Sequence, residues 1–382
     1  MAAIRNYGIM WKTVSEDCNL ACSYCYYSRV MGKPETIRRP EPRILEKVLA
    51  DYLATCGRAA NIAWQGGEPT LAGLNFFRDV VKLEQELAKP PQVISNAIQT
   101  NGILIDQSWA EFFKEYRFLV GVSLDGNQIV HDQYRVDSRG KGSWQRVLKG
   151  IRWLQKENVD FNILTVVGPH NVRHGRDLMK FYESEGFRWV QFIPQMSFQS
   201  QRPEDAGLYA ISPKDYGQFL CETFDEWYNH GFPKMSIRYF DNVLSTYIGL
   251  TPDLCTIHAS CPPHLVIESN GDIYPCDFYL DSRWKLGNIQ DISLSEAFNT
   301  ETYEVFRRMK PRLPETCQSC HWKPYCRGGC PRNRVFNLEA DNTPDYFCEA
   351  FQMFFDYAHK RLQSLAQRIK AERARMALLR VP

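Results

Sequence analysis

The chain has 382 residues, of which 44% are hydrophobic and 24% are charged, and its formal net charge is +2. This length allows more than one domain, and a net charge so close to zero favours neither a nucleic-acid partner nor a membrane surface. No run of 18 apolar residues is present, and the N-terminus lacks a charged segment followed by an apolar one. The sequence therefore predicts a cytoplasmic protein with no membrane span and no signal peptide.

Short apolar runs alternate with amphipathic stretches from residue 9 to about residue 195. Strands are predicted over residues 9–14, 61–65, 93–99, 118–125, 161–167 and 189–194. Helices are predicted between most of them, over residues 44–56, 76–88, 108–116, 144–157 and 176–185. Nearly continuous apolar strands separated by helices are typical of a parallel sheet with helices outside it. We therefore expect an α/β fold of six βα units that close only partly, with its chemistry at the carboxyl ends of the strands.

The pattern changes after these units. A further helix is predicted over residues 212–231, with Ser212 as its cap. Residues 250–348 contain eight cysteines but little periodicity, which indicates a small domain organised around metal, and residues 349–379 again look helical. The sequence thus predicts three parts, residues 1–235, 236–348 and 349–382. His170 and His174 have helical ligand spacing but no third ligand, so we expect a solvated helix start there.

Cysteine is the most informative residue type. There are 13, and 11 of them fall into three groups, at residues 18–25, 255–276 and 317–348. Because a cytosolic chain keeps its thiols reduced, clustered cysteines indicate metal binding or redox chemistry and not disulfides. Cys56 and Cys221 stand alone and are predicted to be plain buried thiols.

The first group, Cys18-x3-Cys22-x2-Cys25, places three thiolates in a loop after the first strand. Three ligands on a four-iron cluster leave one iron open to bind another molecule. A structural zinc loop lacking its fourth ligand is the alternative. With the aromatic Tyr24 before the last cysteine, the motif resembles the signature of radical S-adenosylmethionine (SAM) enzymes. That resemblance implies SAM on the open iron, a 5′-deoxyadenosyl radical that abstracts hydrogen, and a partial (β/α)6 barrel.

Other candidate cofactor contacts follow predicted strands. Gly66 and Gly67 let a ligand approach the backbone closely, and Glu68 can accept from an ammonium group. These residues, with Pro69, resemble the GGEP motif that contacts the SAM amino group in that family. The remaining candidates are Ser123 and Arg135 for SAM, with a surface ion pair as the alternative for Arg135, and Tyr24 and Gln65, which lie beside the SAM site and could place the substrate.

The downstream cysteines form a longer pattern. Cys261, Cys276, Cys317, Cys320, Cys326, Cys330 and Cys348 match the seven-cysteine SPASM pattern of radical SAM proteins, and Cys255 makes an eighth. Eight thiolates suffice for two fully ligated four-iron clusters, giving three [4Fe-4S] clusters in all, whereas two zinc ribbons are the alternative. The resemblance implies one ligand set of Cys255, Cys261, Cys276 and Cys330 and another of Cys317, Cys320, Cys326 and Cys348.

Asp277 directly follows a predicted cluster ligand and is a candidate general base. The segment SNGDIYPCDFYLDSRWKLGNIQD, with YFCEAFQMFFDYAHKRL, resembles anaerobic sulfatase-maturating enzymes, in which the Asp at this position is the proposed base. The resemblance implies oxidation of a sulfatase Cys or Ser to Cα-formylglycine, with an external electron donor such as flavodoxin or ferredoxin. Residues 194–209 match no pattern diagnostic of a substrate.

Two alternatives to this function remain open from the sequence. The first is a SPASM enzyme that cross-links a ribosomal peptide. The 17 residues before Cys18 are too few for the leader-binding domain that such enzymes often carry, which favours sulfatase maturation. The second is a zinc-binding scaffold protein.

Overall fold

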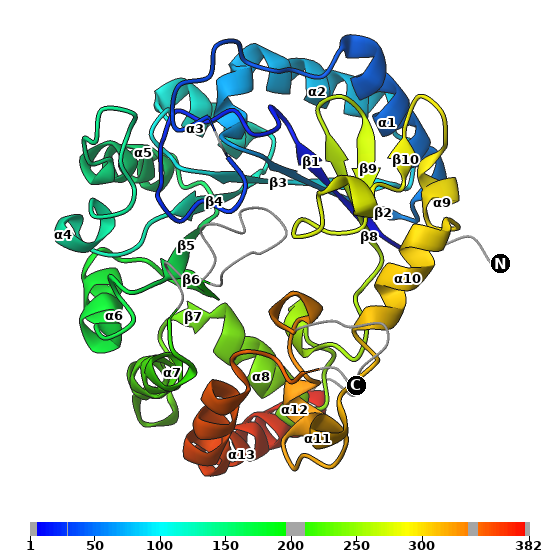
Figure 1. The fold of residues 1–382 in the computed structure, drawn as a ribbon. Helices are drawn as coiled ribbons and strands as arrows, with labels where there is room; N and C mark the ends of the chain where they lie inside the picture. Colours follow the sequence, from blue (N-terminus) through cyan, green and yellow to red (C-terminus); the bar gives the residue numbers. More distant parts are fainter. Residues whose placement is uncertain (1–5, 29, 196–210, 335–342, 379–382) are drawn as a thin grey trace. The chain divides into compact units, whose positions relative to one another are not determined.

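The computed structural model describes residues 6–28, 30–195, 211–334 and 343–378, which fold into two compact units (Figure 1). The first unit contains residues 6–164 and Pro262–Phe306, and the second contains residues 165–195, 211–261 and 307–378. Both units are discontinuous in sequence. The division into residues 1–235, 236–348 and 349–382 stays a prediction, and most of the segment 194–209 lies outside the described residues.

A largely parallel sheet dominates the first unit, with strand order β10-β9-β8-β1-β2-β3-β4-β5. Its parallel strands are β1 (Gly8–Lys12), β2 (Ala59–Gln65), β3 (Val93–Thr100), β4 (Leu119–Ser123), β5 (Phe161–Val167) and β8 (His264–Glu268). The antiparallel strands are β9 (Asp272–Tyr274) and β10 (Gly287–Asn288). The predicted α/β class is confirmed, and the described strands do not close into a complete barrel.

Helices cover the outer side of this sheet (Figure 1). They are α1 (Pro42–Thr55), α2 (Leu74–Leu87), α3 (Gln107–Glu115), α4 (Gln128–His131) and α5 (Trp144–Lys156), followed late in the chain by α9 (Leu294–Ala297) and α10 (Glu301–Met309). Helix α5 shows why they pack: its Val147, Ile151 and Leu154 recur at helical spacing and are fully buried. Inside, Trp11 of β1 stacks on Trp64 of β2 with ring centroids 5.5 Å apart.

All six predicted strands are present, and the sixth is β6 (Trp189–Pro194) of the second unit. The sequence did not predict β8, β9 or β10, because each is five residues or shorter and lies among cysteines, prolines and glycines. Strand β8 pairs in parallel with β1, so a segment near residue 266 completes a sheet that starts at residue 8. This pairing brings Glu268 of β8 next to Lys12 of β1, at the candidate site.

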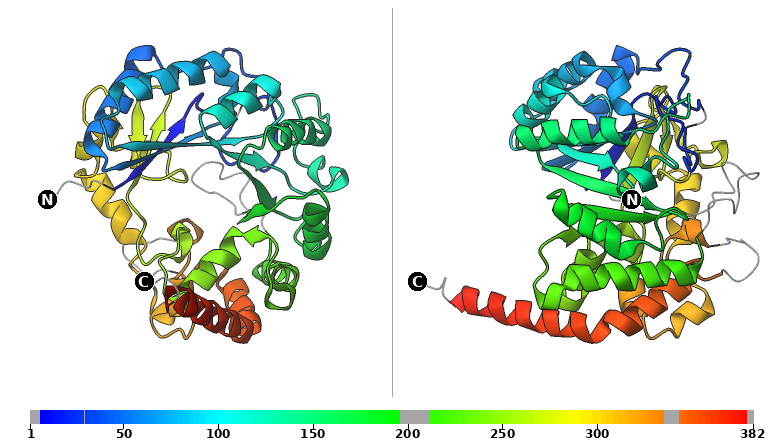
Figure 2. Two further views of the ribbon diagram at one scale, coloured as in Figure 1. Left: turned by 180° about the vertical axis from the view of Figure 1, so that it is seen from behind. Right: turned by 90° about the vertical axis from the view of Figure 1, so that its left-hand side faces the viewer.

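The second unit packs mainly helix on helix. It contains β6, β7 (Ser236–Ile237), α6 (Gly175–Ser184), α7 (Pro213–Tyr228), α8 (Arg238–Ile248), α11 (Glu315–Gln318), α12 (Lys323–Cys326) and α13 (Cys348–Leu378). The predicted cap of α7 is confirmed, since Ser212 Oγ accepts from the Asp215 N–H at 3.0 Å. Figure 2 shows the long helix α13, which packs along α7.

Two further predictions are decided by burial. Cys56 and Cys221 are buried thiols, as predicted. The prediction for His170 is wrong: its residue is 7% exposed, in the turn before α6, whereas His174 at the start of the helix is open to solvent. Spacing alone cannot distinguish the two, because the helix begins only at Gly175.

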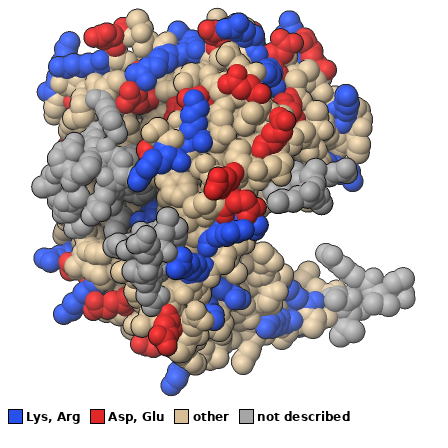
Figure 3. All heavy atoms as spheres, turned by 45° about the vertical axis from the view of Figure 1, so that its right-hand side comes forward, with Lys and Arg blue, Asp and Glu red and all other residues tan. Residues whose placement is uncertain are grey.

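The charged surface is mixed. On the face drawn in Figure 3, Lys and Arg side chains lie among Asp and Glu side chains over the described residues. Among the described helices, none combines the length and the apolar character that crossing a bilayer requires.

Candidate active site

Three thiols lie on the cysteine loop, which we define as residues 13–28, directly after β1. Cys18 is buried, whereas Cys22 and Cys25 are half-buried. The backbone N–H of Leu20 donates to Cys18 Sγ at 3.4 Å, and that of Ser28 donates to Cys25 Sγ at 3.2 Å. Backbone N–H groups directed at sulfur are a usual feature of iron–sulfur sites. This set of donors fits a cluster held by three cysteines.

A neighbouring turn holds the cysteine loop in place. The N–H of Gly67 donates to the Ser15 carbonyl at 2.6 Å, and the N–H of Glu68 donates to the Asp17 carbonyl at 2.7 Å. A Cβ atom at Gly67 would lie 2.0 Å from the Asp17 oxygen, so no other residue fits there. The close approach at Gly67 is therefore made by another segment of the chain's own backbone, at Asp17. Contact of Gly66 and Gly67 with SAM stays a prediction.

We expect Gly67→Ala to disturb the cysteine loop and to remove roughly four irons per chain, the content of one cluster. Overpacking of this kind costs about 1–3 kcal/mol where the backbone has to move. Iron and sulfide analysis of the anaerobically purified variant measures the loss. Gly8→Ala is the matched control, because a Cβ there meets its nearest atom at 3.6 Å. Full iron content in Gly67→Ala would show that the loop tolerates the shift.

Glu68 is fully buried and already well supplied with donors. Its Oε1 accepts from the Thr70 N–H, the Thr70 hydroxyl and the Thr100 hydroxyl, and its Oε2 accepts from the Asn101 N–H at 2.7 Å. Burial raises the pKa of Glu68, and these hydrogen bonds oppose the rise. Oε2 accepts one hydrogen bond from the described residues, against three on Oε1, so it is the oxygen that could accept from a further donor. The predicted contact of Glu68 with an ammonium group is compatible with this and stays a prediction.

A buried chain of polar contacts joins Tyr24, Asp125 and Arg135. The Tyr24 hydroxyl donates to Asp125 Oδ2, and Arg135 Nη1 donates to the Tyr24 oxygen at 2.6 Å. Arg135 is only 7% exposed, so it is not the surface ion pair that was the alternative. Its Nε has no hydrogen-bond partner among the described residues. Because an unsatisfied buried guanidinium N–H is costly, a carboxylate ligand would fit there.

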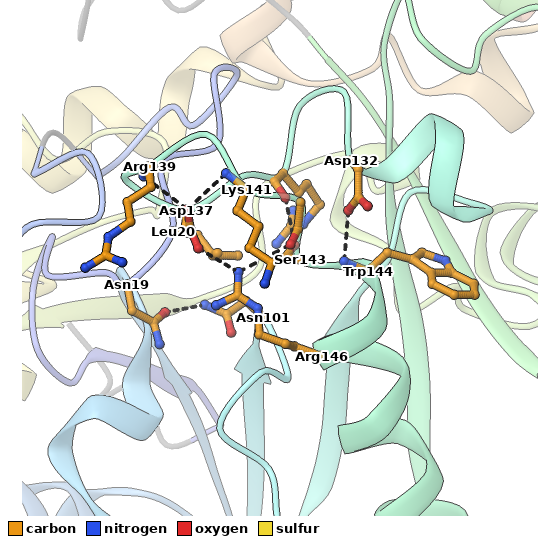
Figure 4. A network of polar contacts seen from close by, with 12 residues as sticks. Asn19, Leu20, Asn101, Asp132, Asp137, Arg139, Lys141, Ser143, Trp144 and Arg146 are labelled. Carbon is orange, nitrogen blue, oxygen red and sulfur yellow. Dashed lines mark hydrogen bonds and ion pairs between the residues drawn. The ribbon is translucent and has the colours of Figure 1, made fainter.

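Residues 136–146 lie next to the cysteine loop and are held in shape by hydrogen bonds among themselves (Figure 4). Asp137 Oδ1 accepts from the N–H groups of Arg139 and Lys141, each at 3.0 Å, and Asp137 Oδ2 pairs with Arg146 at 3.1 Å. The adjoining Val136 carbonyl accepts from the Ala21 N–H at 2.7 Å. The cysteine loop is therefore anchored on two sides, by this segment and by the Gly67 turn.

Asn101 gives a further link, since its Nδ2 donates to Asn19 Oδ1 at 2.8 Å (Figure 4). Ser123 ends β4 and accepts from Gln99 Nε2 at 3.1 Å. Its hydroxyl hydrogen stays available to a ligand, which is compatible with the predicted role toward SAM.

Asp277 lies between two side chains of the first unit. The Tyr26 hydroxyl donates to Asp277 Oδ2 at 2.6 Å, and the Lys12 ammonium forms an ion pair with Asp277 Oδ1. Tyr26 directly follows Cys25, and Asp277 directly follows Cys276. One hydrogen bond thus joins the cysteine loop to the segment that carries Cys276.

Lys12 is the functional residue that sequence reasoning missed. Its side chain has no exposed surface, its Nζ donates to Gln65 Oε1 at 3.4 Å, and it lies 4.4 Å from the centroid of the Tyr27 ring. The strand register explains the grouping: Lys12 pairs with Gln65 of β2 on one side and with Glu268 of β8 on the other. A lysine inside the apolar run IMWKTV was the available signal.

Glu268 extends this polar group. Its carboxylate accepts from the Tyr27 hydroxyl at 2.8 Å and from the Ser15 hydroxyl at 2.6 Å. A cavity of about 370 Å³ adjoins these three residues. The carboxyl ends of β1, β2 and β8 therefore form a polar edge, and the cavity adjoins it at Ser15, Tyr27 and Glu268.

The remaining predicted ligands of the second unit fall into two groups. Burial raises the pKa of Cys261 to about 12; Lys310 opposes the rise, and the nearby Cys330 and Cys255 thiols add to it. Cys255, Cys261 and Cys330 therefore form one group, which we call the first cysteine group of the second unit. Burial likewise raises the pKa of Cys348 to about 11, with added contributions from Cys317 and Cys320, and that of Cys326 to about 12, with contributions from Cys348 and Cys317.

The second group is therefore Cys317, Cys320, Cys326 and Cys348. The separation into two groups could not be obtained from spacing, and it is compatible with the two ligand sets that the family resemblance implies. Cys276 belongs to the first unit. The ligation itself stays a prediction.

The family model described as Radical SAM superfamily matches residues 13–182, and the model described as Iron-sulfur cluster-binding domain matches residues 261–321. The cysteine-type anaerobic sulfatase-maturating enzyme of Clostridium novyi (strain NT) is 36% identical over 95% of this chain and 98% of its own. The serine-type enzyme of Bacteroides thetaiotaomicron is 34% identical over 96% of this chain and 92% of its own.

A solved structure agrees with these relatives. Native anSMEcpe with bound AdoMet and Kp18Cys peptide is 36% identical, with a TM-score of 0.88 over 95% of this chain and 99% of that chain. Identity above 30% over almost the whole length is sufficient to assign a family. The chain therefore belongs to the anaerobic sulfatase-maturating enzymes, radical SAM enzymes with an iron–sulfur SPASM domain.

Proposed function

We propose that this protein oxidises a Cys or Ser side chain of a sulfatase polypeptide to Cα-formylglycine. The observation that carries the proposal is the hydrogen bond of 2.6 Å from Tyr26 to Asp277. It holds a carboxylate between the cysteine loop and Cys276, which supports a role for Asp277 as the base toward a substrate radical. The names of the relatives, cysteine-type and serine-type, support the substrate class.

The chain's residues would hold three [4Fe-4S] clusters and one SAM. Cys18, Cys22 and Cys25 would hold the first cluster, and Arg135, Ser123 and Glu68 would contact SAM, which a solved relative binds. The other ligand sets are Cys255, Cys261, Cys276 and Cys330, and Cys317, Cys320, Cys326 and Cys348. When bound and reduced by one electron, the first cluster and SAM supply the 5′-deoxyadenosyl radical that abstracts hydrogen.

The residues around Asp277 would complete the oxidation. After the β-hydrogen is abstracted, Asp277 Oδ2 or Oδ1 takes the remaining acidic proton, while Lys12 and Tyr26 keep the carboxylate in position. The clusters that the SPASM cysteines would hold could take up the electron that stays on the peptide. With Ser the product is the aldehyde; with Cys it is a thioaldehyde, which water would convert to the aldehyde with release of hydrogen sulfide. Gln65, next to Lys12, would position the peptide. An external donor such as flavodoxin or ferredoxin would supply the first electron.

The test is anaerobic incubation with SAM, a reductant and two matched peptides, one with Cys and one with Ser before x-Pro-x-Arg. We expect 5′-deoxyadenosine together with an oxidised peptide, detected by mass spectrometry and by trapping of the aldehyde with a hydrazine. The ratio of the two rates gives the preference between Cys and Ser. If neither peptide changes mass while another peptide elicits deoxyadenosine release, the proposed substrate is wrong and the radical SAM class stands.

A further inference from the structure

Lys310 of the second unit is a buried lysine between two cysteine segments. Its residue is 1% exposed. Its Nζ donates to the Thr256 carbonyl at 2.9 Å and to the Gly329 carbonyl at 2.6 Å. Thr256 directly follows Cys255, and Gly329 directly precedes Cys330. The ammonium group is therefore held by the backbone that carries two of the predicted cluster ligands.

The thiols of Cys255, Cys261 and Cys330 interact electrostatically with the Lys310 ammonium. Burial lowers the pKa of Lys310, while the charges of Cys330, Cys261 and Cys255 raise it. In return, Lys310 lowers the pKa of Cys261 and of Cys330, against the effect of burial. Lys310 therefore acts on these thiols from between the two cysteine segments, together with Arg334 near Cys261 and Arg332 near Cys330.

The Gly328–Gly329 pair explains how the backbone directs carbonyl oxygens at Lys310 and Arg334. Both residues have positive φ angles, +76° and +68°. A Cβ at Gly329 would lie 2.1 Å from Asp345 Oδ2, and one at Gly328 would lie 2.7 Å from Arg334 Nη2. The positive φ angles and the close neighbours favour glycine at both places, where the backbone turns its carbonyl oxygens toward buried cations. The Gly329 carbonyl accepts from Lys310, and the Gly328 carbonyl accepts from Arg334.

The second cysteine group has different neighbours. The Asp345 carboxylate raises the pKa of Cys326, Cys348 and Cys317, and Lys310 is not among the main influences on these thiols. Asp345 Oδ2 also accepts from the Cys330 N–H at 2.9 Å, so it lies at the border of both groups. The Lys310 ammonium is bonded to the backbone beside Cys255 and Cys330, so its charge acts mainly on the first group.

We propose that Lys310 raises the reduction potential of the iron–sulfur cluster bound by Cys255, Cys261 and Cys330, which makes this cluster the preferred acceptor of the substrate's electron. The inference rests on the proposed function, since it needs that cluster to be present. In the step concerned the peptide carbon radical loses one electron, Asp277 takes one proton, and the cluster gains the electron. A nearby cation stabilises the more negative reduced form more than the oxidised form.

The experiment is a redox titration of the cluster-loaded enzyme followed by electron paramagnetic resonance. Lys310→Gln keeps a side-chain donor for the two carbonyls and removes the charge, whereas Lys310→Arg keeps the charge. We expect Lys310→Gln to make one cluster about tenfold harder to reduce, which is about 59 mV for one electron. The signal that moves should be insensitive to SAM, and Lys310→Arg should titrate like the wild type.

Three unchanged potentials in Lys310→Gln with full iron content would overturn the inference, as would a shift confined to the SAM-sensitive signal. If Lys310→Gln loses iron, Lys310→Met and Lys310→Arg are titrated instead, and equal potentials in these two would overturn it. Failure of the proposed function is distinct, because the wild type would then hold roughly four irons per chain, the content of one cluster, or leave both peptides unchanged.

Discussion

Asp277→Asn is expected to slow peptide oxidation by about 10²–10⁴-fold, the usual contribution of a general base, while SAM cleavage continues. The amide keeps the size of the carboxylate and can still accept from Tyr26, but it cannot take a proton. Hydrogen abstraction depends on Cys18, Cys22 and Cys25 of the cysteine loop, and the amide can keep the loop's one hydrogen bond to this position, from Tyr26. The measurement compares 5′-deoxyadenosine with oxidised peptide in the same reaction, and their ratio should rise far above one.

The control for this variant is Asp291→Asn, because Asp291 is exposed in the turn after β10. It should oxidise peptide at the wild-type rate. Equal coupling of deoxyadenosine to product in Asp277→Asn and in the wild type would remove Asp277 as the base. Loss of both products would instead indicate that the substitution disturbs the neighbouring Cys276.

Much of the first unit could be predicted from the sequence because its signals are local. The strands β1 to β6 are continuous apolar runs, and each is observed within two residues of its predicted ends. The cysteine loop follows β1 as expected, since Cys18, Cys22 and Cys25 need only their own spacing to be recognised.

The polar edge around Asp277 could not be predicted, because it depends on which strands become neighbours. Lys12, Gln65 and Glu268 come from three distant segments and meet through the register of β2, β1 and β8. Strand β8 is five residues long and its partner precedes it by about 250 residues. A hydrophobic pattern identifies strands but does not give their order in the sheet.

The two cysteine groups of the second unit show the same limit in another form. The motif gives the identity of the thiols, but their partition depends on where Gly328, Gly329 and Lys310 turn the chain. Lys310 itself lies in the sequence RRMKPR, where a lysine is expected to be exposed. Only the packed structure shows that it is buried against carbonyl oxygens.

The second large effect is expected from Lys12→Met, which should destabilise the protein by about 3 kcal/mol and also uncouple peptide oxidation from SAM cleavage. Methionine keeps the apolar stem of the lysine but leaves the Asp277 carboxylate without its cation. The Lys12 side chain has no exposed surface and that of Asp277 is 13% exposed, so water cannot replace the lost partner well. Anaerobic thermal denaturation of cluster-loaded protein, compared at equal iron content, gives the change in stability.

The double variant Lys12→Met/Asp277→Asn separates the ion pair from the packing of Lys12. Removing both charges leaves no buried ion, so the double variant should be more stable than Lys12→Met alone, with a coupling of about 1–3 kcal/mol. Strictly additive losses would show that the charge of Lys12 is not coupled to that of Asp277, and that its other contacts, such as that of the ammonium with the Tyr27 ring, account for its contribution. Activity distinguishes the roles further: Lys12→Arg, which retains the cation, should recover part of the oxidation, whereas the double variant should recover stability and none. A stable but inactive double variant would indicate that the buried ion pair is needed for the reaction at Asp277 and not for folding. It would also indicate that the stability lost in Lys12→Met comes from the unpaired Asp277 carboxylate.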